Sequence, residues 1–137
     1  MLLDDALTHL VHTATYGLSD QFLSKGVISA DRIMIETTGG KPVVVSDVSN
    51  DPRIQYPQET MKEGIFSELS VPLYLRDRIT GVLRIYSGKR QEFSADVIKL
   101  LSAIADLSAI AIENARMHES LKKAHDVCLT ELGYWQP

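Results

Sequence analysis

The sequence predicts an α+β fold in which an antiparallel β-sheet is combined with one long C-terminal helix. Residues 67–75 and 79–87 alternate in side-chain character on either side of a short turn, which is typical of a β-hairpin. From Ser94 to about residue 127, apolar residues recur at helical spacing after a capping serine. The 137 residues, of which 45% are hydrophobic and 23% charged, suit one globular domain.

The first two elements are predicted from β-branched residues and from helix-capping chemistry. Residues 7–17 are rich in β-branched residues and end at Gly17, so we expect a strand closed by a turn. Residues 18–26 offer Ser19 as a helix cap and Gly26 as a stop, which predicts a helix of about two turns.

Three further short elements are predicted before the hairpin. Residues 30–42 indicate a second short helix that Gly39 and Gly40 bring to an end. The valine run within residues 42–48 predicts a short buried strand. Residues 58–63 predict a brief helix that a glycine ends.

The hairpin carries the clearest alternation in the chain. Its turn lies at residues 76–78, where Asp77 tolerates a left-handed backbone. Pro72 lacks a ladder donor, which predicts a bulge or an edge at that position of the first strand. The first strand is predicted to carry Leu69, Val71, Leu73 and Leu75 on one face. The second strand is predicted to carry Ile79, Gly81, Leu83 and Ile85 on one face, and Thr80, Val82, Arg84 and Tyr86 on the other.

The C-terminal helix is expected to be longer than a compact domain of this size needs. Ser94 caps it, Asp96 favours its N-terminus, and Phe93 can pack against Ile98 as a hydrophobic staple. About 34 residues span roughly 50 Å at 1.5 Å per residue. We therefore expect the last third of the helix to project from the domain.

A stripe of residues on this helix follows alternating steps of four and three, the spacing of a coiled-coil seam. We expect the first half of the stripe to pack on the sheet. The second half allows two interpretations, a core helix with a frayed polar end or a parallel homodimer through residues 111–128. The stripe consists of Leu100, Ile104, Leu107, Ala111, Asn114, His118, Leu121, His125 and Cys128.

Charge and cysteine content exclude several classes of protein. A net charge of −4 with scattered basic residues argues against a nucleic-acid groove, which needs a concentrated basic face. Cys128 is the single cysteine, so no intramolecular disulfide can form, and a reducing cytoplasm fits. No apolar run reaches the length of a signal peptide or membrane span. We expect a soluble, cytoplasmic protein with no membrane contact through these residues.

The histidines do not predict a metal site within one chain. His9 and His12 are three residues apart on a predicted strand and so point to opposite faces. His118 and His125 lie two helical turns apart, about 10 Å along the axis. His125 and Cys128 could meet the same pair across a dimer axis, and an ordinary solvated helix end is the alternative.

The loop sequences do not predict catalysis. TTGGKP (37–42) lacks the first glycine and the hydroxyl residue of a phosphate-binding loop, so a helix stop is expected. In DVSNDPRIQYP (47–57), the acidic residues do not follow the alternation of a calcium loop. Asp47 or Asp51 paired with Arg53 would be a local clamp, typical of turns. We predict no catalytic and no metal-binding residues.

Taken together, five stretches resemble a GAF domain of the bacterial sensory type, from about Leu2 to Leu121. The resemblance implies a PAS-related antiparallel sheet, with short helices over a small-molecule pocket on one face and the long C-terminal helix on the other. We expect a GAF domain over residues 1–121, without its first helix and most of its first strand, and a helix extension and tail over 122–137. The stretches are YGLSDQFL (16–23), GKPVVVSDVSNDPRIQYP (40–57), EGIFSELSVPL (63–73), ITGVLRIYS (79–87) and EFSADVIKLLSAIADLSAIAIENARMHESL (92–121).

Departures from the family patterns argue against two ligand classes of GAF domains, cyclic nucleotides and covalently bound bilins, and against methionine sulfoxide reduction. Cyclic-nucleotide-binding members share an Asn-Lys…Phe…Asp-Glu pattern, of which Phe93 and Asp96 match here and Lys89 matches loosely, while Ser87 and Val97 stand at the Asn and Glu positions. Bilin-binding and methionine-sulfoxide-reducing members need cysteines at the pocket. Cys128 lies instead on the distal helix. No cofactor is identified.

The resulting hypothesis is a non-catalytic sensory or regulatory module that binds a small organic molecule and signals through its C-terminal helix to an output domain. The alternative is a ligand-free dimerisation scaffold of a larger signalling protein. Met61 and Phe66 could equally be ordinary core residues. The expected pocket or rim residues are Asp47, Tyr56, Met61, Phe66, Arg84 and Tyr86.

Overall fold

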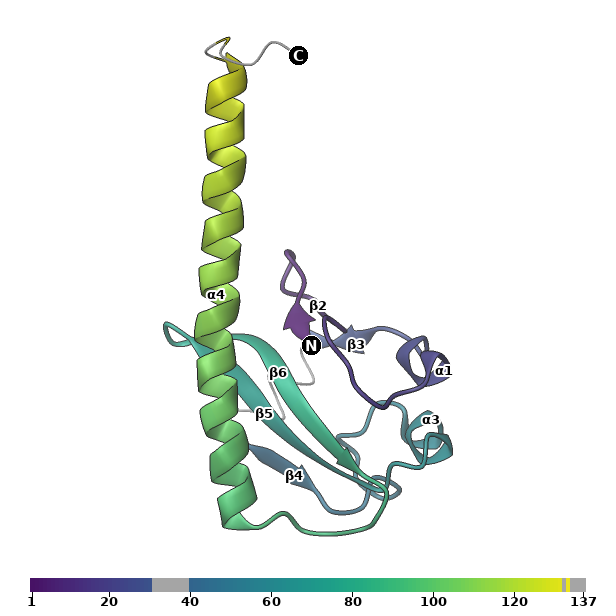
Figure 1. Ribbon diagram of the computed structural model, residues 1–137. Helices are drawn as coiled ribbons and strands as arrows, with labels where there is room; N and C mark the ends of the chain where they lie inside the picture. Colours follow the sequence, from purple (N-terminus) through teal and green to yellow (C-terminus); the bar gives the residue numbers. More distant parts are fainter. Residues whose placement is uncertain (31–39, 132, 134–137) are drawn as a thin grey trace.

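The computed structural model describes residues 1–30, 40–131 and 133. In chain order its elements are β1 (Leu2–Leu3), β2 (His9–Val11), α1 (Asp20–Leu23), β3 (Ile28–Ser29), β4 (Val43–Val45), α3 (Pro57–Lys62), β5 (Ser67–Leu75), β6 (Arg78–Ser87) and α4 (Ala95–Glu131). The strands form one six-stranded antiparallel sheet in the order β3-β2-β1-β6-β5-β4. Helix α4 runs across the sheet, and α1 and α3 lie away from it on the other side (Figure 1). The predicted α+β class is confirmed.

The central hairpin β5–β6 is confirmed with its expected strands. Arg76 and Asp77 form the connection with φ angles of 48° and 62°. Two consecutive residues with positive φ match the right-handed twist of a hairpin, so Arg76 shares the strained geometry expected of Asp77 alone. The predicted helix over residues 30–42 falls largely on residues 31–39, which lie outside the described residues.

Pro72 is accommodated in the way that its missing donor requires. The ladder between β4 and β5 reaches only as far as Val43 opposite Ser70, so no described strand needs the Pro72 main-chain nitrogen on that side. Just beyond, the β5–β6 register shifts between Leu73 and Tyr74. The Thr80 hydroxyl donates to the Leu73 carbonyl oxygen at this bulge (3.1 Å).

Helix α4 packs on the sheet through a face different from the predicted one. The stripe through Leu100, Ile104 and Leu107 was expected to lie on the sheet, but these side chains are 64%, 43% and 69% exposed. This prediction is wrong. The packed face is one residue further along, where small side chains let the helix approach the sheet closely. It consists of Leu101, Ala105 and Ala109, which pack against Leu69, Val71 and Leu73 of β5.

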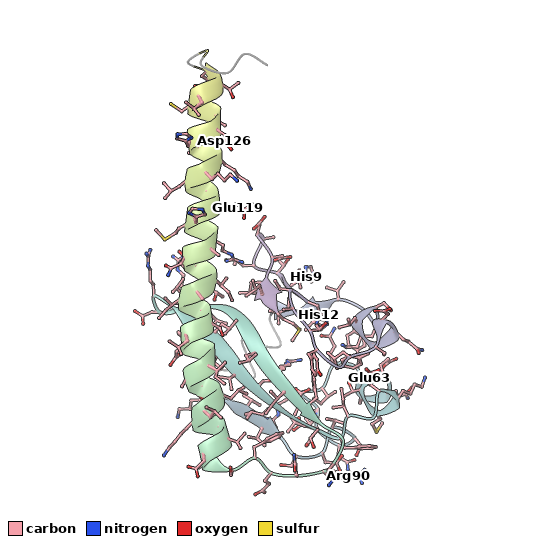
Figure 2. All side chains as sticks on the ribbon, in the orientation of Figure 1. His9, His12, Glu63, Arg90, Glu119 and Asp126 are labelled. Carbon is pink, nitrogen blue, oxygen red and sulfur yellow. The ribbon has the colours of Figure 1, made fainter. Side chains whose placement is uncertain are left out.

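The expected projection of α4 is confirmed. The hydroxyl oxygen of Ser94 accepts the Val97 N–H (3.3 Å), which caps the start of the helix. The helix ends four residues later than predicted, and its 37 residues span roughly 55 Å. Every residue from Asn114 to Cys128 is exposed. Figure 2 shows Glu119 and Asp126 on this projecting part, far from the sheet.

The N-terminal elements are shorter than predicted. Strand β2 covers only His9–Val11 of the predicted strand, because Leu7 adopts a left-handed backbone (φ 58°) in a turn that Asp4 stabilises. The Ser19 cap of α1 is confirmed by its bond from the Phe22 N–H (3.1 Å). The helix has one turn rather than two, because the chain leaves it at Ser24.

Candidate functional site

The sheet face opposite α4 is covered by a roof of short elements. The roof consists of α1, α3 and the loop over residues 47–56. Phe22 of α1 and Met61 of α3 pack with Val45 and Tyr86 of the sheet in one apolar cluster. The phenyl and phenol rings of Phe22 and Tyr86 meet edge to face, with centroids 5.9 Å apart. The roof therefore rests directly on β6.

A small cavity, here called the roof cavity, lies between the roof and the sheet. Its volume is about 30 Å³, which is room for one or two water molecules. It is lined by Phe22, Lys25, Ile28, Arg53, Ile54, Gln55, Tyr56, Thr60, Glu68, Arg84 and Tyr86.

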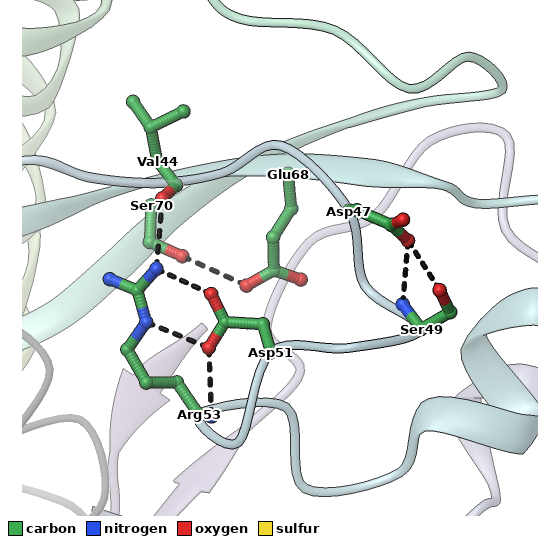
Figure 3. Close-up of polar contacts among 7 residues, drawn as sticks. All are labelled: Val44, Asp47, Ser49, Asp51, Arg53, Glu68 and Ser70. Carbon is green, nitrogen blue, oxygen red and sulfur yellow. Dashed lines mark hydrogen bonds and ion pairs between the residues drawn. The ribbon is translucent and has the colours of Figure 1, made fainter.

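An ion pair forms the floor of the roof cavity. The Arg84 Nε lies 3.9 Å from Glu68 Oε1, and their side chains are only 13% and 6% exposed. The Ser70 hydroxyl also donates to Glu68 (3.4 Å; Figure 3). A buried carboxylate is costly unless it is paired with a cation, and Arg84 supplies that cation for Glu68.

Lys25 brings a second cation to the same cavity. Its Nζ lies 3.4 Å from the centroid of the Phe22 ring and donates to the Phe22 carbonyl oxygen (3.3 Å). Burial, aided by the positive charge of Arg84, lowers the pKa of Lys25 from 10.5 to about 8, although Glu68 acts in the opposite direction. Burial raises the pKa of the Tyr86 phenol, which therefore stays protonated at neutral pH.

Local hydrogen bonds shape the loop over residues 47–56. Asp51 accepts the Arg53 N–H (2.9 Å) and the Arg53 Nε–H (2.9 Å), while the Arg53 guanidinium also donates to the Val44 carbonyl oxygen (3.1 Å; Figure 3). Asp47 accepts the Ser49 N–H (3.0 Å). The predicted local clamp between Asp51 and Arg53 is confirmed, and the turn chemistry is that of Asx turns.

Tyr56 and Gln55 connect this loop to the segment before β3. The Tyr56 hydroxyl donates to the Val27 carbonyl oxygen (2.8 Å), and Gln55 Nε2 donates to the same oxygen (2.9 Å). Gly26, with φ 144°, lies against the Tyr56 ring, where a Cβ would be only 2.5 Å from the hydroxyl oxygen. A glycine is therefore required at this contact.

A second and larger hollow, here called the β6 hollow, lies beside β6. Its volume is about 630 Å³, within the range of ligand sites. The segment after β2 forms its outer wall, and His12 Nε2 is buried there with no hydrogen-bond partner among the described residues. Figure 2 shows His12 on the N-terminal segment beside β6, and Glu63 at the roof. The lining residues are Met1, His12, Ala14, Thr15, Tyr16, Gly17, Leu18, Glu63, Ile65, Leu83, Arg84, Ile85, Tyr86, Ser87 and Gly88.

The sequence profile of the GAF domain matches residues 4–113. The chain belongs to the GAF family. A comparison with the curated proteins found no match. Within the described residues there is neither a helix able to span a bilayer nor a group of three or more His, Cys, Asp or Glu residues suited to a metal ion.

Solved structures share the GAF fold of this chain. A domain assigned to a two-component sensor histidine kinase of Sinorhizobium meliloti is 21% identical with a TM-score of 0.76, covering 88% of this chain and 81% of that one. The GAF domain of a phosphoenolpyruvate-protein phosphotransferase from Coxiella burnetii is 21% identical, with a TM-score of 0.74 and coverages of 87% and 72%. The blue-light-absorbing form of the PixJ GAF domain of Thermosynechococcus elongatus is 15% identical, with a TM-score of 0.64 and coverages of 90% and 77%.

The six residues predicted for the GAF pocket fall into two groups. Tyr56, Arg84 and Tyr86 line the roof cavity, and the last two also line the β6 hollow. The other three line neither of these spaces. Met61 packs in the apolar cluster under the roof, the ring centroid of Phe66 lies 5.7 Å from the Arg90 guanidinium, and Asp47 is bound by Ser49 and Arg90.

Lys25, Glu68, Phe22 and His12 are site residues that the sequence reasoning missed. Glu68 carried a usable signal, because it alternates with the apolar residues of β5 and so points to the pocket face of a sheet covered on both sides. Lys25 follows a one-turn helix, and its approach to Phe22 depends on where that helix ends. No sequence pattern predicts such a contact.

Proposed function

We propose that the chain is a cytoplasmic, non-catalytic sensory or regulatory GAF module that binds a small organic molecule under its roof. In this proposal the module covers residues 1–121, and residues 122–137 extend its last helix towards an output domain. The observation that carries the proposal is the meeting of Lys25, Glu68 and Arg84 beneath the aromatic rings of Phe22 and Tyr86. Charged groups that converge beside aromatic rings can bind both the polar and the apolar parts of a small molecule.

Ligand entry would require the roof to move, since the roof cavity holds only about 30 Å³. The roof elements suit such a movement, because α1 has four residues and α3 has six. Arg84 and Tyr86 face both the roof cavity and the β6 hollow, so a shift of the roof would join the two spaces. The ligand would stabilise the open roof only through its higher affinity for that state.

Strand β5 offers a route from the ligand to α4. Glu68 and Ser70 face the roof cavity side, while Leu69 and Val71, their neighbours in the same strand, pack against α4. A displacement of β5 by ligand contacts therefore acts directly on Ala105 and the rest of the packed helix face. The coupling free energy between the ligand site and α4 equals the difference between the ligand's binding free energies for the two states.

Metabolite screening by thermal shift, with native mass spectrometry of the purified protein, tests this function. We expect at least one small polar metabolite to raise the melting temperature, and Lys25→Met and Glu68→Gln to abolish the shift. Lys62→Met is the matched control, because Lys62 lies exposed on α3. Retained stabilisation in Lys25→Met and Glu68→Gln would place the ligand elsewhere, and the proposal would fail.

The alternative function is a ligand-free dimerisation scaffold, with a parallel homodimer through α4. Two observations favour it, the small volume of the roof cavity and the exposed apolar side chains of Leu100, Ile104, Leu107 and Leu121. Light scattering coupled to size exclusion tests it. Leu121→Glu should lower the oligomeric state, whereas Val127→Glu, which lies exposed about 120° around the same helix and away from the seam, should not.

A further inference from the structure

Strand β3 is the outermost strand of the sheet in the described part of the chain. On its inner side Ile28 pairs with β2, and the Ala30 N–H donates to the Thr8 carbonyl oxygen (2.9 Å). Because the main-chain groups of a strand face its two sides alternately, the Val27 carbonyl and the Ser29 N–H face outwards. These outward groups need partners, and no described strand supplies them.

The side chain of Gln55 takes the place of a neighbouring strand at this outer edge. Its Nε2 donates to the Val27 carbonyl oxygen (2.9 Å), and its Oε1 accepts the Ser29 N–H (3.3 Å). One side-chain amide thus satisfies both an acceptor and a donor, as the main chain of a paired strand would. Gln55 belongs to the loop over residues 47–56, so these two bonds tie the roof to the edge of the sheet.

Tyr56 adds a third bond at the same place. Its hydroxyl donates to the Val27 carbonyl oxygen (2.8 Å) and accepts a hydrogen bond from Gln55 Nε2 (3.2 Å). The ring can lie there because Gly26 has no side chain. Gln55 and Tyr56 line the roof cavity, and so does Ile28 on the β3 side of the bonds. The three bonds from Gln55 and Tyr56 to the main chain, here called the Gln55 latch, therefore close the cavity between the loop and β3.

A second tie, between Ser19 and Glu63, joins α1 to the end of α3. The two ties differ in strength. The Glu63 carboxylate is charged, and hydrogen bonds to charged groups are roughly twice as strong as neutral ones. Phe22 of α1 and Met61 of α3 also pack in one apolar cluster. At the latch every bond is neutral, and the Val27 side chain is 59% exposed. The Gln55 latch is therefore the weaker of the two ties.

We propose that the roof cavity opens at the outer edge of β3 by release of the Gln55 latch, while the contact between Ser19 and Glu63 stays closed as a pivot. Gln55 and Tyr56 release together, because they share the Val27 carbonyl oxygen and bond to each other. Gln55 is then a positioning residue, which acts on the site by holding the roof in place. The use of this opening by a small molecule rests on the proposed function, whereas the opening itself does not.

Hydrogen exchange of single amides, measured by NMR on the full chain without a ligand, tests the latch. In the parent protein the Ser29 amide should be protected from exchange. Gln55→Ala should raise its exchange rate by about tenfold or more, because both bonds of the Gln55 amide to the strand edge are lost. Two amides are internal controls, that of Ala30 on the inner side of the same edge and that of Ser19 at the pivot. Their exchange rates should change by less than about twofold.

Tyr56→Phe distinguishes joint release from the loss of one local bond. This variant removes the hydroxyl bond to Val27 and keeps the Gln55 acceptor of the Ser29 amide. If the latch opens as a unit, the Ser29 amide should still exchange about threefold faster or more, the effect of one neutral hydrogen bond. Tyr74→Phe, which removes a phenol hydroxyl on β5, is the matched control and should leave this rate within about twofold.

Three outcomes would overturn the proposal: an unprotected Ser29 amide in the parent, an unchanged Ser29 rate in Tyr56→Phe, or a Ser19 amide that loses its protection together with Ser29. The metabolite screen is a separate measurement. If the latch behaves as expected and no metabolite binds, the proposed function fails and the latch stands. If a metabolite binds and the Ser29 amide behaves otherwise, the latch fails and the proposed function stands.

Discussion

The carboxylate of Glu63 accepts the main-chain N–H of Ser19 at 2.6 Å, across 44 residues of sequence, and also accepts the Ser19 hydroxyl. Glu63 follows α3, and Ser19 caps α1, so this contact fastens the two helices of the roof to each other. This contact therefore joins α1 and α3 into one connected part of the roof.

We expect Glu63→Gln to destabilise the roof in a pH-dependent way. Bonds from Ser19 lower the pKa of Glu63 below its ordinary 4.5. A lowered carboxyl pKa contributes stability that is present above pH 4.5 and is lost as the pH falls through the folded-state pKa. The melting temperature of Glu63→Gln should fall below that of the parent at pH 7 and approach it near pH 3. Glu59→Gln, on the same helix, is the control. A constant difference across this range would contradict the prediction.

Arg84→Met should destabilise the domain by about 3 kcal/mol, because it leaves the Glu68 carboxylate buried without its cation. Adding Glu68→Gln to Arg84→Met should recover part of this loss, since the uncompensated charge is then removed. Denaturant titrations of the single and double variants give the coupling. Additive losses in the double variant would show that the two side chains do not stabilise each other.

Lys25→Met should stabilise the protein most at neutral pH. Its folded-state pKa of about 8 lies below the ordinary 10.5, so the unfolded chain binds more protons between these values. Stability of the parent therefore rises with pH from about 8 to 10.5. Thermal unfolding at pH 7 and pH 10 measures this. The advantage of Lys25→Met over the parent should shrink at the higher pH, and an advantage that grows would refute the assignment.

Substitutions on two faces of α4 test which face packs on the sheet. Ala105 is fully buried against β5, so Ala105→Leu should cost about 1–3 kcal/mol through overpacking. Leu107 is 69% exposed, and Leu107→Ala should change the stability of the monomer by less than about 0.5 kcal/mol. Denaturant unfolding at low protein concentration checks both. A larger loss of stability for Leu107→Ala than for Ala105→Leu would show that the face predicted from the heptad spacing packs on the sheet.

Asp77→Gly should stabilise the hairpin by about 0.5–1 kcal/mol. Asp77 has φ 62° in a two-residue turn, a conformation that glycine adopts without steric cost. Asp77→Val should destabilise it, because a β-branched residue is strained there. Thermal unfolding of the two variants provides the comparison. A loss of stability on Asp77→Gly would mean that the aspartate side chain contributes more than the backbone strain costs.

Several elements could be predicted because their chemistry is local. The β5–β6 hairpin follows from alternation around a turn at Asp77, and the start of α4 follows from the capping hydroxyl of Ser94. The Ser19 cap and the Asp51–Arg53 clamp likewise depend on residues two or three apart. The resemblance of ordered stretches over Leu2–Leu121 then identified the family, which the profile match confirms.

The face of α4 that packs on β5 was decided only by the tertiary structure. Two stripes one residue apart, through Leu100 and through Leu101, both repeat at helical spacing, so periodicity alone cannot choose between them. The choice depends on close approach to the sheet, for which Ala105 and Ala109 leave room. The apolar stripe that remains exposed is the basis of the alternative function.

The candidate site also depended on the tertiary structure. The shared strand face of Arg84 and Tyr86 could be predicted, because side chains alternate along a strand with period two. The sequence pattern could not place Lys25 or Tyr56 on that face. The position of Lys25 depends on where α1 ends, and that of Tyr56 depends on its close contact with Gly26. Contacts between residues far apart in sequence depend on packing free energies summed over many groups, which no local pattern encodes.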